Sequence, residues 1–397
     1  MRYRYRLAAS AIWAIPFALL IRLIRPLIVI RICGIRSDRI GHFVPDIAEH
    51  IGREKIKSPR TYNFYFFRGP ISNTQWESMA KRSSLKVLGN WLRYIDDWSR
   101  IIPCGGLHTL NTTLTDSRDV EGLFHRFDCS IPFLPSEDVS CEDWLRSKGW
   151  TKGEPFVVLH VRDSAYLSQT YSNYDWSYHS YRDSDIETYI PAIEWIASQG
   201  VWVLRMGKSM ANRIHSKSNR IVDYAFDAKK SDLLDIWLFA NCSGCITTAS
   251  GPDMVSAVYG KPLLCVNASP LGLLFSMFNS IWVPKNLYWE DSGLSLDLID
   301  YLENAYSYTE EYRKAGIRIV DLTPQEILFA VEEFWGRIQG VWEEKDQEGR
   351  MQKKFWEEFV NWPLYHSFHN WKHPSSRIGA SWLSSKGLGF ITSKFSE

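Results

Sequence analysis

Short apolar runs alternate with amphipathic segments through the second half of the chain. The apolar runs predict strands at 156–161, 201–206, 221–226, 244–248, 262–267 and 281–284. Helical spacing of apolar residues predicts helices at 185–198, 233–241 and 252–259. Strands that are apolar along their whole length and alternate with helices are typical of a parallel sheet covered on both faces.

The first half has a less regular pattern. Residues 26–35 and 62–68 predict strands, and 46–51 and 76–98 have helical spacing, with a polar loop predicted at 36–43. Gly, Lys and Pro cluster at 148–155 and predict a domain boundary. We therefore expect an α/β protein with two Rossmann-like domains, 26–150 and 151–335, and a helical C-terminal segment, 336–397.

The first 25 residues stand apart because an apolar stretch, 7–21, is bounded by arginines. These are Arg2, Arg4, Arg6, Arg22 and Arg25. A spanning helix needs about 20 apolar residues, and no small-x-small cleavage site of a signal peptide follows. The pattern favours a helix on a membrane surface with Trp13 and Phe17 inserted. A true span and a buried helix of the globular body stay open as alternatives.

Composition excludes little. A net charge of +1 gives no whole-surface field for nucleic acid. The 14% aromatic content suits a core, sugar stacking or a membrane interface equally. Seven scattered cysteines indicate reduced, buried thiols. The pair Cys242 and Cys245 has no partner pair for zinc, so we expect core packing, with redox or metal chemistry as the alternative.

Candidate ligand-binding residues lie where three predicted strands end. In open parallel sheets, ligands bind outside the carboxyl ends of the strands. The candidates are His160, Arg162 and Asp163 after the first strand, Arg205, Gly207 and Lys208 at the second, and Ser250 and Gly251 after the fourth. Cations, small residues and Pro252 at a helix start suit a ligand that carries a diphosphate.

Each candidate also has a purely structural interpretation. These are an ion pair of Arg162 with Asp163 or Asp183, a core position for His160, a solvated loop charge for Lys208, and a plain strand-to-helix connection for 250–252.

The same motifs carry a resemblance to a known family. Residues 160–167 (HVRDSAYL), 181–192, 205–207, 231–238 and 250–267, with 39–43 near the N-terminus, resemble bacterial glycosyltransferases of surface-polysaccharide and glycan synthesis that are recognised mostly through their C-terminal region. The His160-x-Arg162 pair is more distantly similar to GT-B-fold fucosyltransferases, whose arginine holds the donor diphosphate. Asp163 and Ser164 depart from that motif, which has a basic residue or glycine there.

The resemblance implies a GT-B-like enzyme that transfers a sugar from a nucleotide-sugar donor to a glycan or lipid-linked acceptor. No Asp-x-Asp motif ends a strand, so we expect no metal or other cofactor, with Arg162 and the amides after Ser250 stabilising the departing phosphate. His42 or Asp38 is the expected base from the first domain. The resemblance also implies that 336–397 returns to that domain.

We expect the protein on the cytoplasmic face of a membrane, held peripherally or by a single N-terminal anchor, residues 1–25. Two other classes remain open. One is an enzyme related to sugar-nucleotide epimerases, which needs no acceptor. The other is a non-catalytic module that binds a nucleotide or a glycan.

Overall fold

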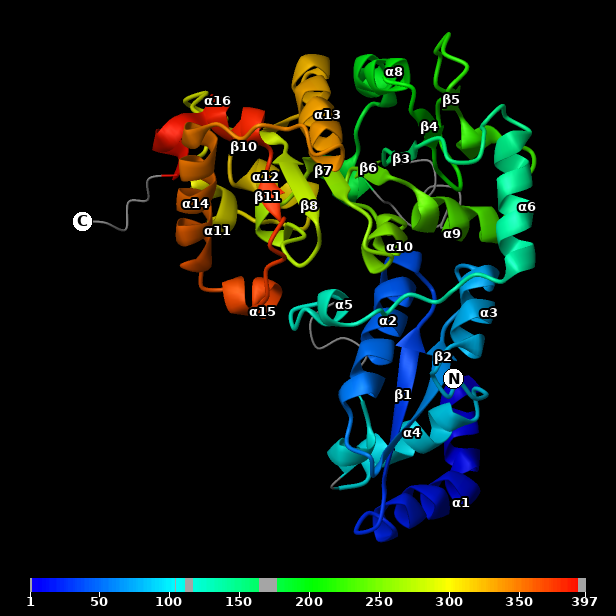
Figure 1. The fold of residues 1–397 in the computed structure, drawn as a ribbon. Helices are drawn as coiled ribbons and strands as arrows, with labels where there is room; N and C mark the ends of the chain where they lie inside the picture. Colours follow the sequence, from blue (N-terminus) through cyan, green and yellow to red (C-terminus); the bar gives the residue numbers. More distant parts are fainter. Residues whose placement is uncertain (1, 104, 111–116, 164–176, 392–397) are drawn as a thin grey trace. The chain divides into compact units, whose positions relative to one another are not determined.

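The computed structural model describes residues 2–103, 105–110, 117–163 and 177–391. The chain divides into two compact units (Figure 1). Unit 1 comprises residues 1–119 and 123–134, and unit 2 comprises 120–122 and 135–397. Helix α6 (Pro135–Arg146) precedes the boundary that we predicted at 150, yet it belongs to unit 2, because it packs on α9 (Asp232–Asn241) and Asp138 accepts a hydrogen bond from Trp237 Nε1 at 2.8 Å.

Unit 1 is a small α/β unit built on two parallel strands. Its elements are α1 (Arg2–Leu23), β1 (Val29–Arg36), α2 (Ile40–Ile56), β2 (Thr61–Arg68), α3 (Thr74–Arg82), α4 (Leu92–Ile101), η1 (Gly105–His108) and α5 (Leu123–Arg126). Strands β1 and β2 pair from Val29↔Thr61 to Arg36↔Arg68. Single bridges from Ile32 to Thr109 and from Tyr65 to Val87 extend the pairing on either side.

Two expectations for unit 1 differ from the structure. Residues 76–98 form two helices, α3 and α4, because Ser83 closes α3 by donating its backbone N–H to Ala80 O and 83–91 follow as a connection. The polar loop predicted at 36–43 is shorter, since α2 begins at Ile40. His42 therefore lies in the first turn of a helix.

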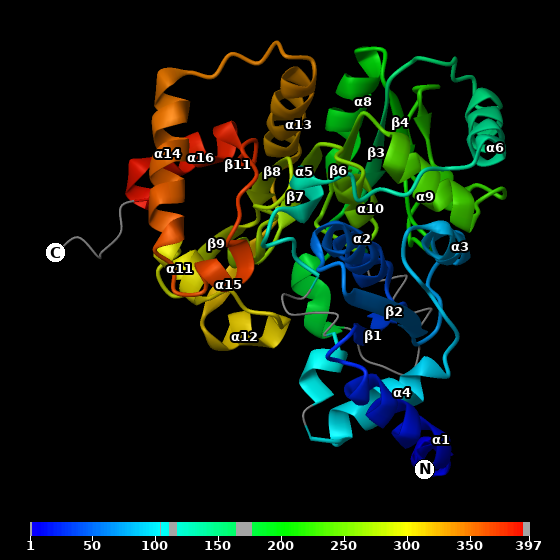
Figure 2. The ribbon, with the colours of Figure 1, turned by 60° about the horizontal axis from the view of Figure 1, so that its bottom comes forward.

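The N-terminal helix α1 lies beside α4 at one end of unit 1 (Figures 1 and 2). One face carries Ala14, Ala18 and Ile21 into a core cluster with β1, β2 and α4. The opposite face leaves large apolar side chains exposed, among them Ile12 and Leu23, at 85% and 77%. By length and composition, α1 is apolar enough to cross a membrane. The predicted N-terminal apolar helix is thus present, and one of its faces belongs to the core of unit 1.

Unit 2 contains a seven-stranded parallel sheet in the order β11-β8-β7-β6-β3-β4-β5. Its strands are β3 (Phe156–His160), β4 (Trp202–Arg205), β5 (Ile221–Val222), β6 (Gly244–Thr247), β7 (Leu263–Ala268), β8 (Ser280–Pro284) and β11 (Arg377–Ile378). The antiparallel pair β9 (Asn286–Trp289) and β10 (Ile317–Val320) stands apart. The α/β class and the large parallel sheet predicted for this half are confirmed.

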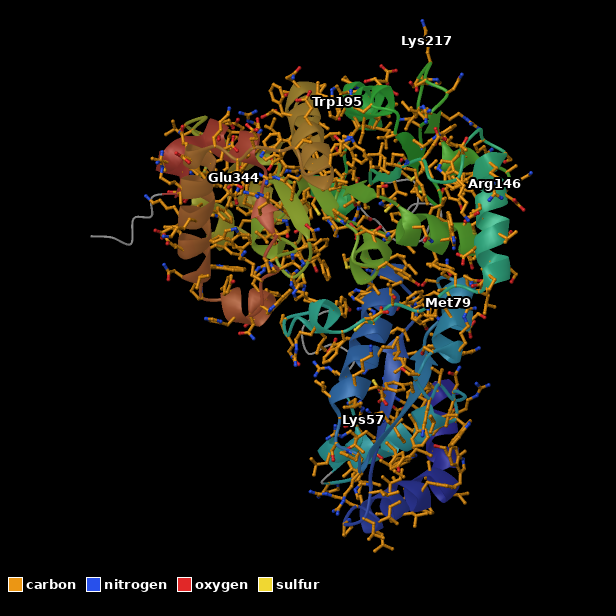
Figure 3. All side chains as sticks on the ribbon, in the orientation of Figure 1. Lys57, Met79, Arg146, Trp195, Lys217 and Glu344 are labelled. Atoms are coloured by element: carbon orange, nitrogen blue, oxygen red, sulfur yellow. The ribbon has the colours of Figure 1, made fainter. Side chains whose placement is uncertain are left out.

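Helices cover both faces of the sheet. In Figure 1, α8 (Ile190–Ser198) and α13 (Pro324–Ile338) lie on one side, and α9 and α10 (Asp253–Val258) lie on the other. Charged side chains such as Arg146 and Lys217 project from the outer surface (Figure 3). The remaining elements are η2 (Ser177–Arg182), η3 (Ile186–Tyr189), η4 (Tyr224–Phe226), η5 (Leu271–Leu273), α11 (Leu298–Glu303), α12 (Thr309–Lys314), α14 (Asp346–Val360), α15 (Tyr365–His369) and α16 (Ala380–Ile391).

The strand order reverses direction between β3 and β6. From β3 the chain winds outward to β4 and β5, and it then crosses back to β6 and continues the other way to β7 and β8. In doubly wound sheets, such a switch point opens a crevice at the carboxyl ends of the two strands. The topology of unit 2 therefore singles out residues that follow His160 and Thr247.

The C-terminal residues belong to unit 2 by their contacts. Strand β11 pairs with β8, and α16 packs on α13 and α14. Buried Glu333 links these elements, since it pairs with Arg337 at 2.9 Å and accepts the backbone N–H of Ala380 at 2.6 Å. A return of the last helix to the first domain stays a prediction.

Candidate functional site

Arg162 lies two residues after the end of β3, at the switch point. Its backbone N–H donates to Thr248 Oγ1 of the neighbouring β6 end at 3.0 Å. Its side chain is 14% exposed, and Nε donates to Asp183 Oδ1 at 3.2 Å. Among the described residues, no acceptor is hydrogen-bonded to its Nη groups. The ion pair with Asp183, one of the predicted alternatives, is therefore present and uses only the Nε edge of the guanidinium.

A second arginine, Arg182, lies on the segment that folds back onto the end of β3. Ser184 N donates to Arg162 O at 3.0 Å and holds this segment in place. Arg182 Nη2 donates to Ala249 O at 2.7 Å, in the turn after β6. No carboxylate pairs with Arg182 within the described part of the chain. The two guanidinium groups thus belong to one locus, and we had not singled out Arg182 as a site residue.

Burial and the neighbouring charges shift the pKa values of Arg162 and Asp183. Burial and then the nearby Arg182 lower the pKa of Arg162, and Asp183 only partly opposes this. Burial also raises the pKa of Asp183 although Arg162 and Lys285 act against it. Two cations that share one partly desolvated place favour the binding of an anion, because an anion relieves their repulsion.

A buried lysine extends the network toward β8. Lys285 is 3% exposed, and its Nζ contacts Asp183 O and Asp321 Oδ1, both at 2.6 Å. Asn267, near the end of β7, belongs to the same hydrogen-bond network. Its Nδ2 donates to Ser184 Oγ at 2.9 Å, and its Oδ1 accepts Leu322 N at 2.7 Å. These contacts fix the 182–184 segment, and with it Arg182 and Asp183, against three strand ends.

The turn after β6 is organised by Asp253. This carboxylate is fully buried, and its Oδ2 accepts Ser250 N at 2.7 Å and Thr247 Oγ1 at 2.9 Å. Burial raises the pKa of Asp253 to about 7. The backbone amide of Ser250 is thus used inside the turn, and Gly251 O accepts Met254 N at 3.3 Å. Residues 250–252 therefore join strand to helix and also hold Ala249 O against Arg182.

His160, at the last position of β3, is buried at 7% exposure and lies edge-on to Phe239 at 6.1 Å. Burial, followed by Arg205 and Arg162, lowers the pKa of His160 to about 4. The ring is therefore neutral at physiological pH.

Arg205, at the end of β4, is buried and forms an ion pair within unit 2. Its side chain is 1% exposed, and Nη1 pairs with Asp223 Oδ1 at 3.0 Å. Its guanidinium also lies over the ring of Phe226, 5.4 Å from the centroid. The strand predicted at 221–226 ends at Val222, and the carboxylate of the next residue, Asp223, pairs with Arg205.

The other predicted residues near β4 shape its loop. Asp163 Oδ2 accepts Ala211 N at 2.9 Å and so links the loops after β3 and β4. Gly207 has φ +153 and faces Met210 so closely that a Cβ would lie 2.5 Å from it. Lys208 is exposed, and its carbonyl accepts Lys230 Nζ at 2.9 Å. Ser164 to Leu167 of the family motif lie outside the described residues.

The two candidate bases lie in unit 1. Asp38, after β1, pairs with Arg36 at 3.3 Å. His42, in the first turn of α2, contacts Ser117 Oγ through Nδ1 at 2.7 Å. Ser117 Oγ in turn donates to Asp46 Oδ1 at 2.6 Å. The structure therefore joins His42 to two residues that we had not predicted, while Asp38 has a separate partner.

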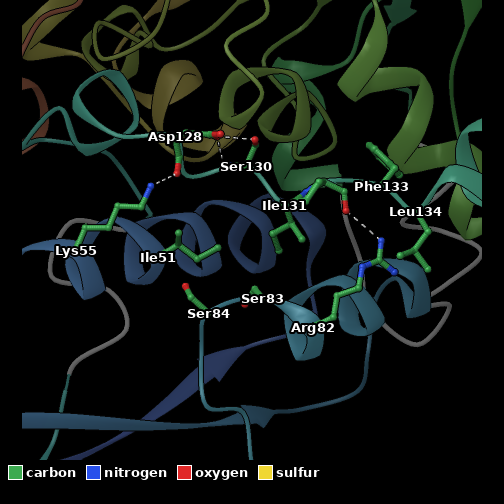
Figure 4. A pocket seen from close by; sticks show the side chains of 11 residues that line it. Ile51, Lys55, Arg82, Ser83, Ser84, Asp128, Ser130, Ile131, Phe133 and Leu134 are labelled. Carbon is green, nitrogen blue, oxygen red and sulfur yellow. Dashed lines mark hydrogen bonds between the residues drawn. The ribbon is translucent and has the colours of Figure 1, made fainter.

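A cavity of about 600 Å³ lies beside the end of α2 in unit 1 (Figure 4). Two of its cations face carbonyl oxygens, since Lys55 Nζ donates to Asp128 O at 2.5 Å and Arg82 Nη2 to Pro132 O at 3.3 Å. At about 1.5 Å per residue, the nearer lining residue on α2, Ile51, lies roughly 14 Å along the helix from His42. The cavity is thus distant from the candidate base.

Metal ligands and thiols add no further site in the described residues. No group of three His, Cys, Asp or Glu side chains converges there. The six described cysteines are buried and unpaired. Cys242 Sγ contacts Phe239 O at 3.3 Å, in keeping with core packing.

Comparisons with known proteins give distant structural matches only. No family model and no curated protein matches the chain. A family 9 glycosyl transferase from Veillonella parvula DSM 2008 is 13% identical with a TM-score of 0.40, over 62% of this chain and 82% of that chain. The ADP-heptose LPS heptosyltransferase II of E. coli is 10% identical with a TM-score of 0.34, over 64% and 85%. At these identities and TM-scores, the matches assign no activity to this chain.

Proposed function

We propose that the protein is a nucleotide-sugar-dependent glycosyltransferase whose donor diphosphate binds to Arg162 and Arg182 in unit 2. The observation that carries this proposal is that two arginines lie beside the switch point of a doubly wound sheet, near enough for Arg182 to lower the pKa of Arg162. Guanidinium groups bind phosphate oxygens with parallel hydrogen bonds. In such sheets the switch point is where phosphate-bearing ligands bind.

The same two residues suit the chemistry of transfer. When the acceptor oxygen bonds to the anomeric carbon, the bond from that carbon to the β-phosphate oxygen breaks. The electron pair stays on the nucleoside diphosphate, so negative charge grows there in the transition state. Two fixed cations in a partly desolvated place stabilise this charge without reorganisation. They supply the charge that a metal ion supplies in other enzymes, and we therefore propose transfer without a metal.

The proton of the acceptor hydroxyl needs a base. Of the two candidates in unit 1, we favour His42, because a neutral imidazole has one nitrogen that can accept a proton and its ring is fixed through Ser117. Asp38 is already paired with Arg36. We assign Arg205 and Asp163 to the structure of unit 2, because both side chains bond within it.

We further propose that α1 holds unit 1 on a membrane surface, where a lipid-linked or membrane-proximal glycan is the acceptor. The exposed face of α1 presents Ile12, Phe17, Leu19, Leu20 and Leu23. Arg22 fixes the other side by donating to Ser99 O at 3.1 Å and Ile102 O at 3.3 Å. A helix that shares one face with a core and exposes an apolar face lies in the interface more readily than across it.

A screen of nucleotide sugars tests the function. A donor at a hundred times its dissociation constant stabilises the fold by about 2.7 kcal/mol, and a transferase then releases nucleoside diphosphate only with an acceptor. Conversion of the donor to an isomer with no acceptor would identify an epimerase-like enzyme instead. Stabilisation without turnover for any acceptor would leave a binding protein, and no stabilisation by any donor would refute the proposal.

A further inference from the structure

Three polar side chains of unit 1 form a hydrogen-bonded chain. His42 lies on the first turn of α2, and Asp46 lies one turn later on the same helix. Ser117, far away in sequence, lies between them, 2.7 Å from His42 Nδ1 and 2.6 Å from Asp46 Oδ1. Asp46 is fully buried, Ser117 is 8% exposed, and His42 is half-buried.

The single hydroxyl hydrogen of Ser117 decides where the imidazole carries its proton. This hydrogen points to Asp46, so the hydroxyl oxygen can only accept from His42. Nδ1 of His42 must therefore carry a proton, which leaves Nε2 as the basic nitrogen of the neutral ring. The buried carboxylate thus acts on the imidazole through one intervening hydroxyl.

The backbone at Ser117 supports a role for its side chain. Ser117 has φ +65, a left-handed conformation that glycine adopts easily and other residues seldom do. Such strain persists only where the surroundings impose it, and it is concentrated at functional sites. Here a hydroxyl is held at a position where glycine would be the less strained residue.

We propose that Ser117 and Asp46 are positioning residues that hold the proton of His42 on Nδ1 and so leave Nε2 as the nitrogen that accepts the proton of the acceptor hydroxyl. This rests on the proposed function. In the step, Nε2 takes the hydroxyl proton while the acceptor oxygen attacks the anomeric carbon, and the diphosphate leaves with the electron pair. The imidazolium then donates from Nδ1 to Ser117, and Ser117 to Asp46, whose charge stabilises the cation.

Nitrogen NMR of the full chain labelled in its histidine rings measures the tautomer directly. Of the ten histidines, His42 is assigned by loss of its signals in His42→Gln. Two others serve as internal references: His108 Nδ1 donates to Ile30 O at 2.8 Å, and His369 Nε2 donates to Gly272 O at 2.8 Å. Their carbonyl partners fix opposite tautomers.

The wild type should show His42 protonated on Nδ1, like His108. Ser117→Gly removes the hydroxyl and relieves the left-handed strain, so the protein should stay folded. His42 should then populate both tautomers while the references keep theirs. A wild-type His42 protonated on Nε2 in its neutral form, or a tautomer that Ser117→Gly leaves unchanged, would overturn the relay. This readout needs no donor or acceptor, so it decides the relay even if the proposed function fails.

Asp46→Asn separates positioning from charge. The amide oxygen of asparagine still accepts the Ser117 hydroxyl, so the tautomer should remain on Nδ1. The imidazolium loses its counter-charge, and kcat of transfer should fall about tenfold or more with the KM of the donor unchanged. Unchanged kcat in Asp46→Asn, or transfer at the wild-type rate in His42→Gln, would remove His42 and its two partners from the mechanism.

Discussion

Arg162→Lys tests the donor site most directly. In the wild type, the guanidinium uses Nε for Asp183 at 3.2 Å, and no described residue accepts from its Nη groups. Lysine keeps the positive charge beside Asp183 and keeps the backbone hydrogen bond to Thr248. It loses the planar pair of donors that grips a diphosphate. The substitution therefore removes the geometry of the contact and leaves the charge.

The expected losses of activity and stability differ in size. Loss of one preorganised donor to a developing oxyanion costs about a hundredfold in kcat, or about 2.7 kcal/mol of transition-state stabilisation. Free energy of unfolding should fall by less than about 1 kcal/mol, because Asp183 keeps a cation nearby and is itself 28% exposed. Since charge on the diphosphate rises during the reaction, kcat should fall more than the affinity for donor.

Arg205→Lys is the matched control. Arg162 lies just after β3 and Arg205 is the last residue of the neighbouring strand β4, but Arg205 is 1% exposed and paired with Asp223. The same substitution should lower the free energy of unfolding by about 3 kcal/mol, because it disrupts a buried ion pair. Its kcat, measured well below the melting temperature, should stay near the wild-type value.

The assay follows nucleoside diphosphate released per enzyme at saturating donor and acceptor, alongside urea unfolding of each variant. The reasoning is refuted if Arg162→Lys transfers sugar at a near-normal rate. It is equally refuted if Arg162→Lys unfolds like Arg205→Lys, since Arg162 would then serve only as the structural partner of Asp183. A reversed pattern, with Arg205→Lys inactive and stable, would move the diphosphate to β4.

Three further results are expected. Arg182→Lys should weaken donor binding and lower kcat about tenfold, with melting little changed; wild-type affinity would remove it from the site. Burial raises the pKa of Asp253 to about 7, so the folded state holds that proton more tightly, and wild-type stability falls as pH rises from about 4 to about 7. In Asp253→Asn, the loss of unfolding free energy between about pH 4 and pH 7, measured by urea unfolding, should be smaller by up to about 4 kcal/mol. An unchanged dependence of stability on pH would contradict the raised pKa of Asp253. Leu19→Glu with Leu23→Glu should release the protein from anionic vesicles in a sedimentation assay, whereas Phe329→Glu, a control at an exposed apolar position of α13, should not.

Substitution on α1 is a better membrane test than deletion of the helix. Ala14, Ala18 and Ile21 fill a cluster with Phe66 and Leu92 in unit 1. Removal of residues 1–25 would expose that cluster, so a change in sedimentation could come from unfolding or aggregation. Leu19 and Leu23 lie on the outer face and leave the cluster intact.

The strands of unit 2 could be predicted from the sequence because burial on both faces leaves continuous apolar runs. Strands β3, β4, β6, β7 and β8 lie within a residue or two of the predicted ranges. The prediction fails where a polar contact between distant residues decides the local structure. Residues 221–226 are apolar enough for a strand, yet the strand ends at Val222 and Asp223 pairs with Arg205.

The candidate site depends on which strands lie side by side in the sheet, and the periodicity of apolar residues does not predict that order. Arg162 follows one apolar strand and Arg205 ends another, so their local sequence patterns are alike. Their neighbours in the folded sheet differ. Strand β3 pairs with β6, and Arg162 N donates to Thr248 Oγ1, 86 residues further along the chain. Arg205 instead forms an ion pair with Asp223. Arg182 joins Arg162 only because the 182–184 segment folds back along β3 and is held there by Lys285 and Asn267. A second guanidinium at the switch point thus follows from strand order and a returning loop, and both are properties of the folded chain.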